Sequence, residues 1–401
     1  MHKVKFVLQE NEKAWKKLLP LTYFRPISHI RIGSLTIREA WEKALGQKVY
    51  VQPLDIHKEL FYEEIPDDDY TISIDSRLLP TKDAVDFIVS DIERGESILL
   101  NGEPIITYGC CLDDFNESKE ISDVPSDIKL ISHPSDIIRF LEEFLFPVDV
   151  DRLGDFEKFN SADGVVWGNV QNLYVAKDVK IDPCFIDTSD GPVVIDEGAT
   201  IMQGAMIKGP AYIGPHSVVK MGAKIYGPVA LGPYCKVGGE VSHSIFQGYS
   251  NKAHDGFIGH AFISEWVNIG ADTNNSNLKN TYGPVKMWDY AEKRFIDTGM
   301  QFLGLIMGDH AKAGINTMFN TGTVVGVSAN VFGTGFPRTF IPSFAWGGAQ
   351  GFTTYNVERA LDTARRMMAR RKVDLTPEYE RLFRKVFELS QWERWWENKN
   401  K

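Results

Sequence analysis

The chain has 401 residues, with 44 Lys and Arg against 54 Asp and Glu, so its formal net charge is −10. This acidic balance argues against a nucleic-acid or anionic-membrane partner, although local basic sites for phosphate groups remain compatible with it. No apolar run is long enough for a membrane span or a signal sequence, and the four cysteines form no disulfide framework or metal-ligand spacing. We therefore expect a cytoplasmic protein of two or three domains.

Residues 1–150 predict an α/β domain. Short apolar segments at 4–8, 48–51 and 71–74 have the character of strands, and the segments 35–45 and 81–95 have that of helices. Alternating strands and helices favour an open, Rossmann-like sheet with a largely parallel core. We expect residues 151–164 to link this domain to the next.

A six-residue repeat follows. Eight aliphatic residues are spaced six apart, and a mostly small residue stands four positions after each of the first seven; the eight are Ile195, Ile201, Ile207, Ile213, Val219, Ile225, Leu231 and Val237. This period is typical of a parallel β-helix, in which each unit forms one short strand and one corner. The repeat resumes from Phe257 and again from Met307, so we expect the β-helix to span 165–345, with an insertion near 287–301.

Residues 346–401 predict two helices, at 356–371 and 377–395. Thr376 followed by Pro377 is a typical helix start. The run Arg365, Arg366, Arg370, Arg371 and Lys372 is interpreted as a solvated helix face, with a phosphate site as the alternative.

The repeat is interrupted by two motifs that suggest chemistry. Lys252-Ala253-His254 and Val267-Asn268-Ile269-Gly270-Ala271 resemble the acetyltransferase half of the bifunctional N-acetylglucosamine-1-phosphate uridylyltransferase/glucosamine-1-phosphate N-acetyltransferase family. The resemblance implies a left-handed β-helix, a homotrimer and acetyl-CoA as acyl donor. It also implies that His254 is the general base, a role that suits a side chain titrating near neutral pH, although a lone histidine is more often structural.

The same resemblance implies further site residues. Asn268 and Asn277 would contact the amino sugar, Ala271 would lie near acetyl-CoA, and Lys279 and Lys220 would meet a sugar phosphate. Three features depart from the family pattern. Lys220 stands where the family has an arginine, Phe257 replaces a tyrosine, and Glu240-Val241-Ser242 lacks a lysine. The identity of the sugar is therefore open.

The first domain lacks the glycine-rich loop with which sugar nucleotidyltransferases usually begin. Its segments 19–27 and 30–33 resemble instead a variant group of the bifunctional family found in bacteria of the Bacteroidetes kind. This resemblance implies that Arg25, Arg31 and Gly33 bind a nucleoside triphosphate and that Asp75 binds magnesium (Mg2+), with a turn aspartate as the alternative for Asp75.

The leading hypothesis from the sequence is a transferase with two activities. It would acetylate an amino-sugar phosphate from acetyl-CoA and would also transfer a nucleotidyl group to a sugar 1-phosphate. One alternative is a monofunctional nucleotidyltransferase whose β-helix serves assembly or regulation. The other is a trimeric scaffold without activity.

Overall fold

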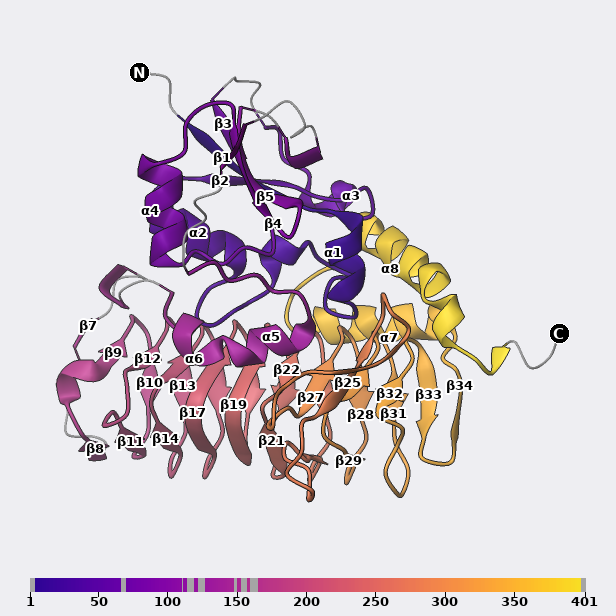
Figure 1. The fold of residues 1–401 in the computed structure, drawn as a ribbon. Helices are drawn as coiled ribbons and strands as arrows, with labels where there is room; N and C mark the ends of the chain where they lie inside the picture. Colours follow the sequence, from indigo (N-terminus) through magenta and orange to yellow (C-terminus); the bar gives the residue numbers. More distant parts are fainter. Residues whose placement is uncertain are drawn as a thin grey trace.

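An α/β domain rests on the long side of a β-helix, and two C-terminal helices border both parts (Figure 1). The computed structural model describes residues 4–65, 70–109, 111–113, 119–121, 127–147, 150–152, 157–158 and 165–397. The predicted fold class, an α/β domain followed by a β-helix and C-terminal helices, is confirmed. Most of the predicted linker, residues 151–164, lies outside the described residues.

The α/β domain contains one six-stranded sheet in the order β2-β1-β3-β5-β4-β6. Its strands are β1 (Lys5–Gln9), β2 (Val49–Gln52), β3 (Thr71–Asp75), β4 (Glu96–Leu100), β5 (Glu103–Tyr108) and β6 (Lys119–Ile121). The core strands β2, β1 and β3 are parallel, as predicted, whereas β5 runs antiparallel to β3 and β4, so the complete sheet is mixed. The physical reason is a two-residue turn at Asn101-Gly102, where both residues have positive φ and fold β4 back onto β5 as a hairpin.

The α/β domain also contains the short helices α1 (Glu12–Lys17), α2 (Ile37–Leu45), α3 (Lys58–Phe61), α4 (Lys82–Ser90), α5 (Pro134–Arg139) and α6 (Leu141–Phe144). Of these, α5 and α6 lie along the β-helix, against β17, β19 and β22 (Figure 1). Helix α2 begins at a capping box in which Thr36 and Glu39 satisfy each other's backbone amides, and it ends at Gly46 in the left-handed conformation. Helix α4 ends at Ser90, which is earlier than the predicted residue 95.

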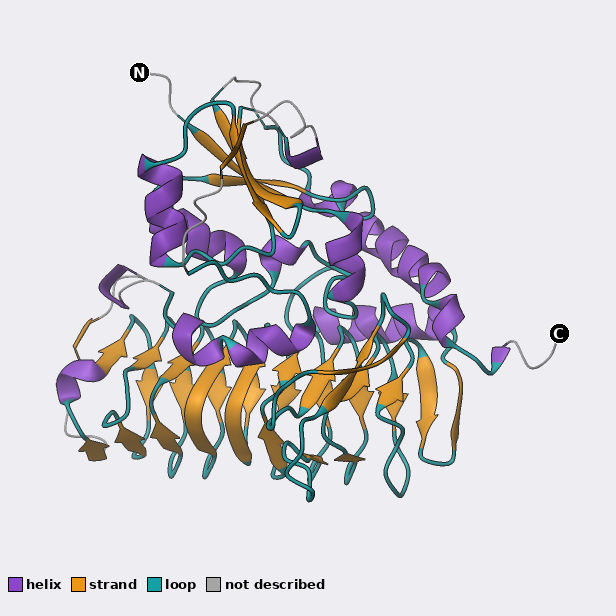
Figure 2. Ribbon diagram, in the orientation of Figure 1, coloured by secondary structure: helices purple, strands orange, loops and turns teal. Residues whose placement is uncertain are grey.

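The β-helix is built from short parallel strands that stack coil upon coil (Figure 2). The aliphatic residues of the repeat are buried in one inner core. The ten-stranded sheet contains β10 (Lys180–Ile181), β13 (Thr200–Ile201), β16 (Val218–Val219), β18 (Lys236–Val237), β20 (Asn251–Lys252), β23 (Asn268–Ile269), β28 (Lys312–Ala313), β31 (Asn330–Val331), β33 (Ala345–Gly348) and β34 (Gly351–Thr354).

The remaining strands of the coils form the other faces. The main path of the fourteen-stranded sheet contains β7 (Glu157–Lys158), β9 (Leu173–Val175), β12 (Val193–Ile195), β15 (Ala211–Ile213), β17 (Lys224–Leu231), β19 (Glu240–Phe246), β22 (Phe262–Ile263), β27 (Leu305–Met307), β30 (Thr323–Val325) and β32 (Phe340–Ile341). Strands off this path are β8 (Val165–Trp167), β11 (Phe185–Asp187), β14 (Met206–Lys208) and β21 (Phe257–Gly259). A two-stranded sheet joins β24 (Asn274–Asn275) to β29 (Met318–Phe319).

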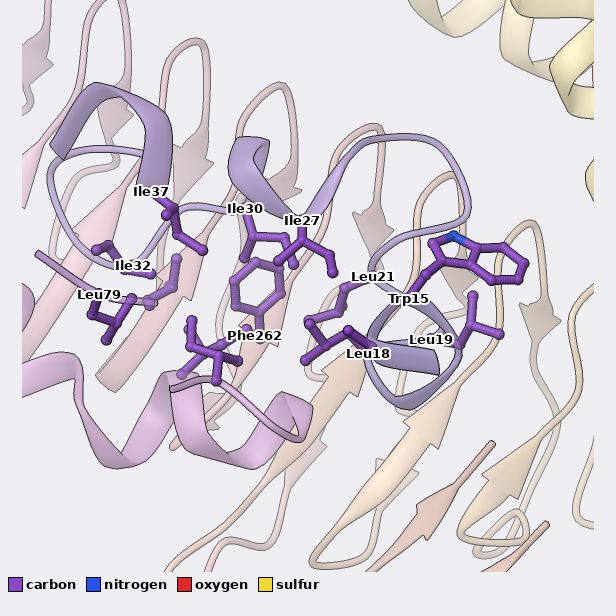
Figure 3. Packing of buried hydrophobic residues seen from close by; sticks show 14 of the residues in the cluster. Trp15, Leu18, Leu19, Leu21, Ile27, Ile30, Ile32, Ile37, Leu79 and Phe262 are labelled. Atoms are coloured by element: carbon purple, nitrogen blue, oxygen red, sulfur yellow. The ribbon is translucent and has the colours of Figure 1, made fainter. Parts of the chain in front are cut away.

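The face of the β-helix beneath the α/β domain is apolar on its outer side as well as its inner side. The outward residues pair in register from coil to coil and are buried; they are Val194, Tyr212, Ala230, Ile245, Phe262, Ile306, Val324 and Phe340. Figure 3 shows Phe262 among Leu18, Ile27 and Ile30 of the α/β domain. The two domains therefore share one hydrophobic cluster.

The insertion forms the antiparallel hairpin β25 (Lys286–Asp289) and β26 (Arg294–Asp297). Its Trp288 stacks on Phe340, with ring centroids 4.3 Å apart. Helix α7 (Val357–Ala369) lies along the β-helix, and α8 (Pro377–Leu389) reaches up beside the α/β domain (Figure 1). Helix α8 ends before the predicted residue 395, and a short 3-10 turn over Gln391–Glu393 follows it.

Candidate functional site

A polar ladder runs across four neighbouring coils of the ten-stranded sheet. Lys236 pairs with Asn251, Asn251 with Asn268, and Asn268 with Lys312. Adjacent parallel strands lie about 4.8 Å apart, so these four outward side chains form a row of two amides between two amines. The register of the β-helix thus brings together residues that are distant in the sequence. Asn268 and Lys312, which lie on neighbouring coils, are 44 positions apart (312 − 268 = 44).

Helix α7 faces this ladder across a cavity of about 580 Å³. Thr363, Arg366, Met367 and Arg370 share one face of the helix because they follow the spacing i, i+3, i+4, i+7. The complete lining is Lys220, Lys236, Asn251, Ala253, His254, Asn268, Lys312, Thr363, Arg366, Met367, Arg370 and Arg371. The cavity therefore brings together three residues predicted for the site: Lys220, His254 and Asn268.

Positive charge dominates this cavity. Six of the twelve lining residues are Lys or Arg and none is Asp or Glu. Arg366 pairs with Asp362 at 2.8 Å, and Arg371 donates to Asn251 Oδ1 at 2.8 Å. Burial lowers the pKa of Lys236, and Arg371, Lys220 and Arg370 lower it further. Cations that crowd together in this way favour an anionic ligand, because a ligand of opposite charge relieves their mutual repulsion.

His254 lies on an exposed turn that a buried lysine holds in place. Lys252 stands in the inward column of the β-helix, where the preceding coils have Val219 and Val237. Its ammonium donates to the carbonyls of His254 and of Asp255, the latter at 2.7 Å, with Gly238 O at 3.5 Å. Burial lowers the pKa of Lys252 to about 8. At this coil a charged side chain takes the place of an aliphatic one in the repeat. Its ammonium binds the backbone of the turn that carries His254.

The cavity does not include Asn277, Lys279 or Ala271. The Asn277 amide donates to His260 Nδ1 at 2.9 Å, and Lys279 donates to the Pro284 carbonyl at 2.6 Å. Ala271 lies in a turn, and its carbonyl accepts from the Asn316 amide at 2.8 Å. Within one chain, none of these three predicted residues lines the cavity that contains His254.

The predicted nucleotide residue Arg25 lies in the interface between the two domains. It is 4% exposed, and its guanidinium forms a double hydrogen bond with the buried Asp309 and an ion pair with Glu265 at 3.1 Å. Burial and the Arg25 pairing act in opposite directions on Asp309, and the pKa of this carboxyl rises to about 6 because burial is the larger effect. A guanidinium occupied by two carboxylates is not available to clamp phosphates, so the geometry corrects this expectation.

Arg31 and Gly33 also have structural partners. The Arg31 side chain donates to the carbonyls of Gln247, at 3.2 Å, and of Ser34. It lines a separate cavity of about 340 Å³ that also contains Glu39, Glu42 and Asp196, so its charge is balanced by acids. Gly33 is needed for close packing, since an added Cβ would lie 2.1 Å from the Phe144 carbonyl oxygen. Neither residue faces a strongly cationic pocket of the kind that lies beside α7.

Comparison with known proteins finds similarity in the first domain. Residues 6–146 match the family model described as sugar nucleotidyl transferase. The α/β domain is therefore similar to sugar nucleotidyl transferases over these residues. A bifunctional sugar-1-phosphate nucleotidylyltransferase/acetyltransferase of Sulfurisphaera tokodaii is 35% identical over 144 residues, which cover 35% of each chain. The protein named Bifunctional protein GlmU of Methanocaldococcus jannaschii is 36% identical over 87 residues, covering 22% of this chain and 21% of its own. These matches thus span about a third or less of either relative.

Solved structures give more distant similarities. The polysialic-acid-specific acetyltransferase NeuO aligns with a TM-score of 0.23 at 13% identity, covering 49% of this chain and 88% of its own. The Arabidopsis UDP-N-acetylglucosamine acyltransferase aligns with a TM-score of 0.18 at 12% identity, covering 53% and 77%. Because both scores are low, the description of the β-helix depends on the strand pairing given above.

The predicted magnesium residue Asp75 has protein partners. Asp75 is buried at the end of β3, and both of its carboxylate oxygens accept hydrogen bonds from Arg77, the closest at 2.8 Å. Among the described residues, no three His, Cys, Asp or Glu side chains come together as a metal site would require. Magnesium binding by Asp75 therefore stays a prediction.

Several lining residues were not foreseen from the sequence. Lys236, Asn251 and Lys312 occupy the outward position before the inward residue of each coil, a position that the repeat leaves unspecified. The basic run is interpreted from the sequence as a solvated helix face, with a phosphate site as the alternative; Arg366 and Arg370 are exposed, and together with Arg371 they line the cavity. The signal in the sequence that indicates this face is the i, i+3, i+4, i+7 spacing of Thr363, Arg366, Met367 and Arg370.

No helix in the described part of the chain has the length and apolar character needed to cross a bilayer.

Proposed function

We propose that this protein transfers an acetyl group from acetyl-CoA to the amine of an amino-sugar phosphate, and that the reaction takes place in the cavity between the β-helix and α7. The observation that carries the proposal is the position of His254 and Asn268 in a cavity lined by six cations. Both substrates carry phosphate groups, which such a lining favours. The bifunctional nucleotidylyltransferase/acetyltransferase relative supports the same class of reaction.

In this mechanism His254 acts as general base. Its imidazole takes a proton from the substrate amine as the nitrogen attacks the thioester carbonyl carbon. The tetrahedral intermediate then collapses, the carbon–sulfur bond breaks, and the CoA thiolate leaves and accepts a proton. The products are an N-acetylated sugar phosphate and free CoA. Exposure of His254 on its turn allows the imidazole to exchange protons with solvent between turnovers.

The test compares His254→Ala with the wild-type protein on glucosamine 1-phosphate and acetyl-CoA. General-base catalysis contributes about 10²- to 10⁴-fold, so we expect kcat to fall by that range while CoA binding is retained. Asp255→Asn is the matched control, because Asp255 is exposed on the same turn and does not line the cavity. Wild-type turnover that His254→Ala leaves unchanged would rule out this base.

Nucleotidyl transfer to a sugar 1-phosphate is the second candidate activity, favoured by the family match of residues 6–146. Arg25 and Asp75 are both occupied by protein partners, so they do not support a catalytic role there. The test is pyrophosphate release from UTP, dTTP, CTP or GTP with a panel of sugar 1-phosphates and magnesium. Release with none of these pairs would leave acetyl transfer as the only proposed activity.

We also propose a homotrimer in which a neighbouring subunit completes the site. The support is that Asn277 and Lys279, expected to contact the sugar phosphate, lie outside the cavity of their own chain. Analytical ultracentrifugation at micromolar concentration should give about three times the mass of the 45.3 kDa chain. Sedimentation as a monomer under conditions where the enzyme is active would contradict this arrangement.

A further inference from the structure

The inward Lys252, which is fully buried, and the outward Lys312, which is half-buried, differ in how many of their N–H groups have protein acceptors. The Lys252 ammonium reaches three backbone carbonyls, those of Gly238, His254 and Asp255, and so uses all three of its N–H groups. The Lys312 ammonium reaches two, the carbonyls of Trp266 at 2.9 Å and His310 at 2.7 Å. Lys312 also lines the cavity that contains His254. In the described part of the chain, one N–H of Lys312 therefore has no protein acceptor.

The residues whose carbonyls bind Lys312, Trp266 and His310, each follow a carboxylate that binds Arg25 of the α/β domain. Trp266 follows Glu265, and His310 follows Asp309. The corners are further tied to each other, because the Glu265 amide donates to Asp309 Oδ1 at 3.1 Å. Two neighbouring corners of the β-helix are thus held between Arg25 on one side and Lys312 on the other.

Electrostatics favour an anion beside Lys312. No carboxylate in the described structure forms an ion pair with it, and burial lowers the pKa of its ammonium to about 7. The charged or titratable side chains that line the cavity with it are all basic; they are Lys220, Lys236, His254, Arg366, Arg370 and Arg371. The carboxylates behind it, Glu265 and Asp309, are paired with Arg25. An anionic ligand would therefore stabilise the charged form of Lys312 and accept its remaining N–H.

We propose that Lys312 is a ligand-binding residue that donates its third N–H to a phosphate group in the His254 cavity, and that Arg25 acts through Glu265 and Asp309 as a positioning residue for it. The inference rests on the proposed function only in naming the ligands, CoA or the amino-sugar phosphate. Both present phosphate groups, and the experiment separates them.

Isothermal titration of the full chain with CoA, glucosamine 1-phosphate and pyrophosphate, each alone, tests Lys312. Loss of one hydrogen bond to a charged group should weaken the binding of at least one probe by about tenfold or more in Lys312→Met. Lys312→Arg, which keeps a charge, should restore most of the affinity. Lys208→Met is the control, since Lys208 is exposed and pairs with Asp190 on the surface. The probe that weakens most identifies the phosphate that Lys312 contacts.

The outcomes separate the two proposals. If the wild-type protein binds neither CoA nor glucosamine 1-phosphate, the proposed function fails, and pyrophosphate still reports on Lys312. If Lys312→Met binds every probe as the wild type does, the inference about Lys312 is overturned. Because the ammonium loses its proton near pH 7, affinity should also fall between pH 6 and pH 8.5 in the wild type. The fall should be smaller in Lys312→Arg.

A double-mutant cycle tests Arg25. Arg25→Met should weaken probe binding in the wild-type background but not in the Lys312→Met background, because its effect passes through Lys312. Glu265→Gln is the second variant in case Arg25→Met does not fold, since the Glu265 side chain is 28% exposed. Arg294→Met on the exposed hairpin is the control. Equal effects in both backgrounds would show that Arg25 does not position Lys312.

Discussion

At the scale of single residues, the polar side chains at the interruptions of the repeat have the clearest functions. Lys252 is the best example, because it occupies a position that is aliphatic in the preceding coils, and its ammonium donates to the backbone carbonyls of the histidine turn. The motif around His254 was recognisable in the sequence. The inward direction of Lys252 was not, since the coil between Val237 and Lys252 is shorter than the regular coils and shifts the register (252 − 237 = 15 against 237 − 219 = 18).

Replacing Lys252 with Met should separate positioning from binding. The change removes the ammonium from the His254 carbonyl, at a cost of about 1–3 kcal/mol, whereas the Asp255 carbonyl still accepts from the Asp272 amide at 2.9 Å. We expect a lower melting temperature and a kcat for acetyl transfer reduced more than KM, because the base loses its orientation. The measurement is steady-state kinetics beside thermal unfolding, with Lys208→Met as control. An unchanged kcat would show that the turn holds His254 without Lys252.

Gly33 gives a residue-scale prediction about packing. A methyl group there would collide with the Phe144 carbonyl at 2.1 Å and with the Leu145 backbone, neither of which is a flexible side chain. Gly33→Ala should therefore lower the free energy of unfolding by about 1–3 kcal/mol, as overpacking typically does. Denaturant titration measures this. Gly299→Ala tests conformational freedom alone, because a Cβ at Gly299 would meet no atom within 4 Å although φ is positive.

At the scale of elements, α7 converts an open face of the β-helix into a cavity. Its amphipathic pattern was sufficient to predict the helix, and the Asn356 cap fixes its start by accepting from the amides of Glu358 and Arg359. The amphipathic pattern did not predict which residues lie opposite the basic face of α7. That depended on the ladder from Lys236 to Lys312, which exists only after the coils have stacked.

The double variant Arg366→Met/Arg370→Met should therefore weaken CoA binding. Each arginine lost from the cavity removes a charge-assisted contact, so we expect a combined loss of about tenfold or more in affinity. Stability should change little, because both side chains are exposed. Arg359→Met on the same helix is the control, since Arg359 does not line the cavity. Calorimetric titration that gives equal affinities for the double variant and the control would exclude α7 from the site.

At the scale of the whole molecule, the α/β domain and the β-helix form one folding unit. A single hydrophobic cluster contains residues of both domains and of α8, for example Ile30, Phe262 and Phe383. The buried contact of Arg25 with Asp309 crosses the same interface. We therefore expect one cooperative thermal transition and not two separate ones.

Arg25→Met should test this coupling. It leaves the Asp309 carboxylate buried without its partner, and breaking a buried pair in this way costs about 3–5 kcal/mol. Calorimetry should show a lower melting temperature for the whole molecule. Arg294→Met, on the exposed hairpin, should have no such effect. Two resolved transitions in the wild-type protein would contradict the single unit.

The sequence by itself determined the elements with a local periodic signal. The six-residue spacing specified the β-helix, because each aliphatic position must be buried in its own coil. The cap at Thr376 marked a helix start, and the motif at Lys252-Ala253-His254 marked the candidate site. Even the hairpin turn at Asn101-Gly102 was encoded locally, although the predicted sheet did not take it into account.

Only the tertiary structure decided which charged residues line one cavity and which are already paired with other protein groups. Arg25 and Asp75 have the residue types that bind phosphate and metal, yet each is paired with protein groups. Lys312 and Lys236, which no motif marked, share a cavity with His254. The physical reason is that burial and pairing depend on long-range contacts between coils and domains, and a charge is free to bind a ligand only where those contacts leave it without a partner.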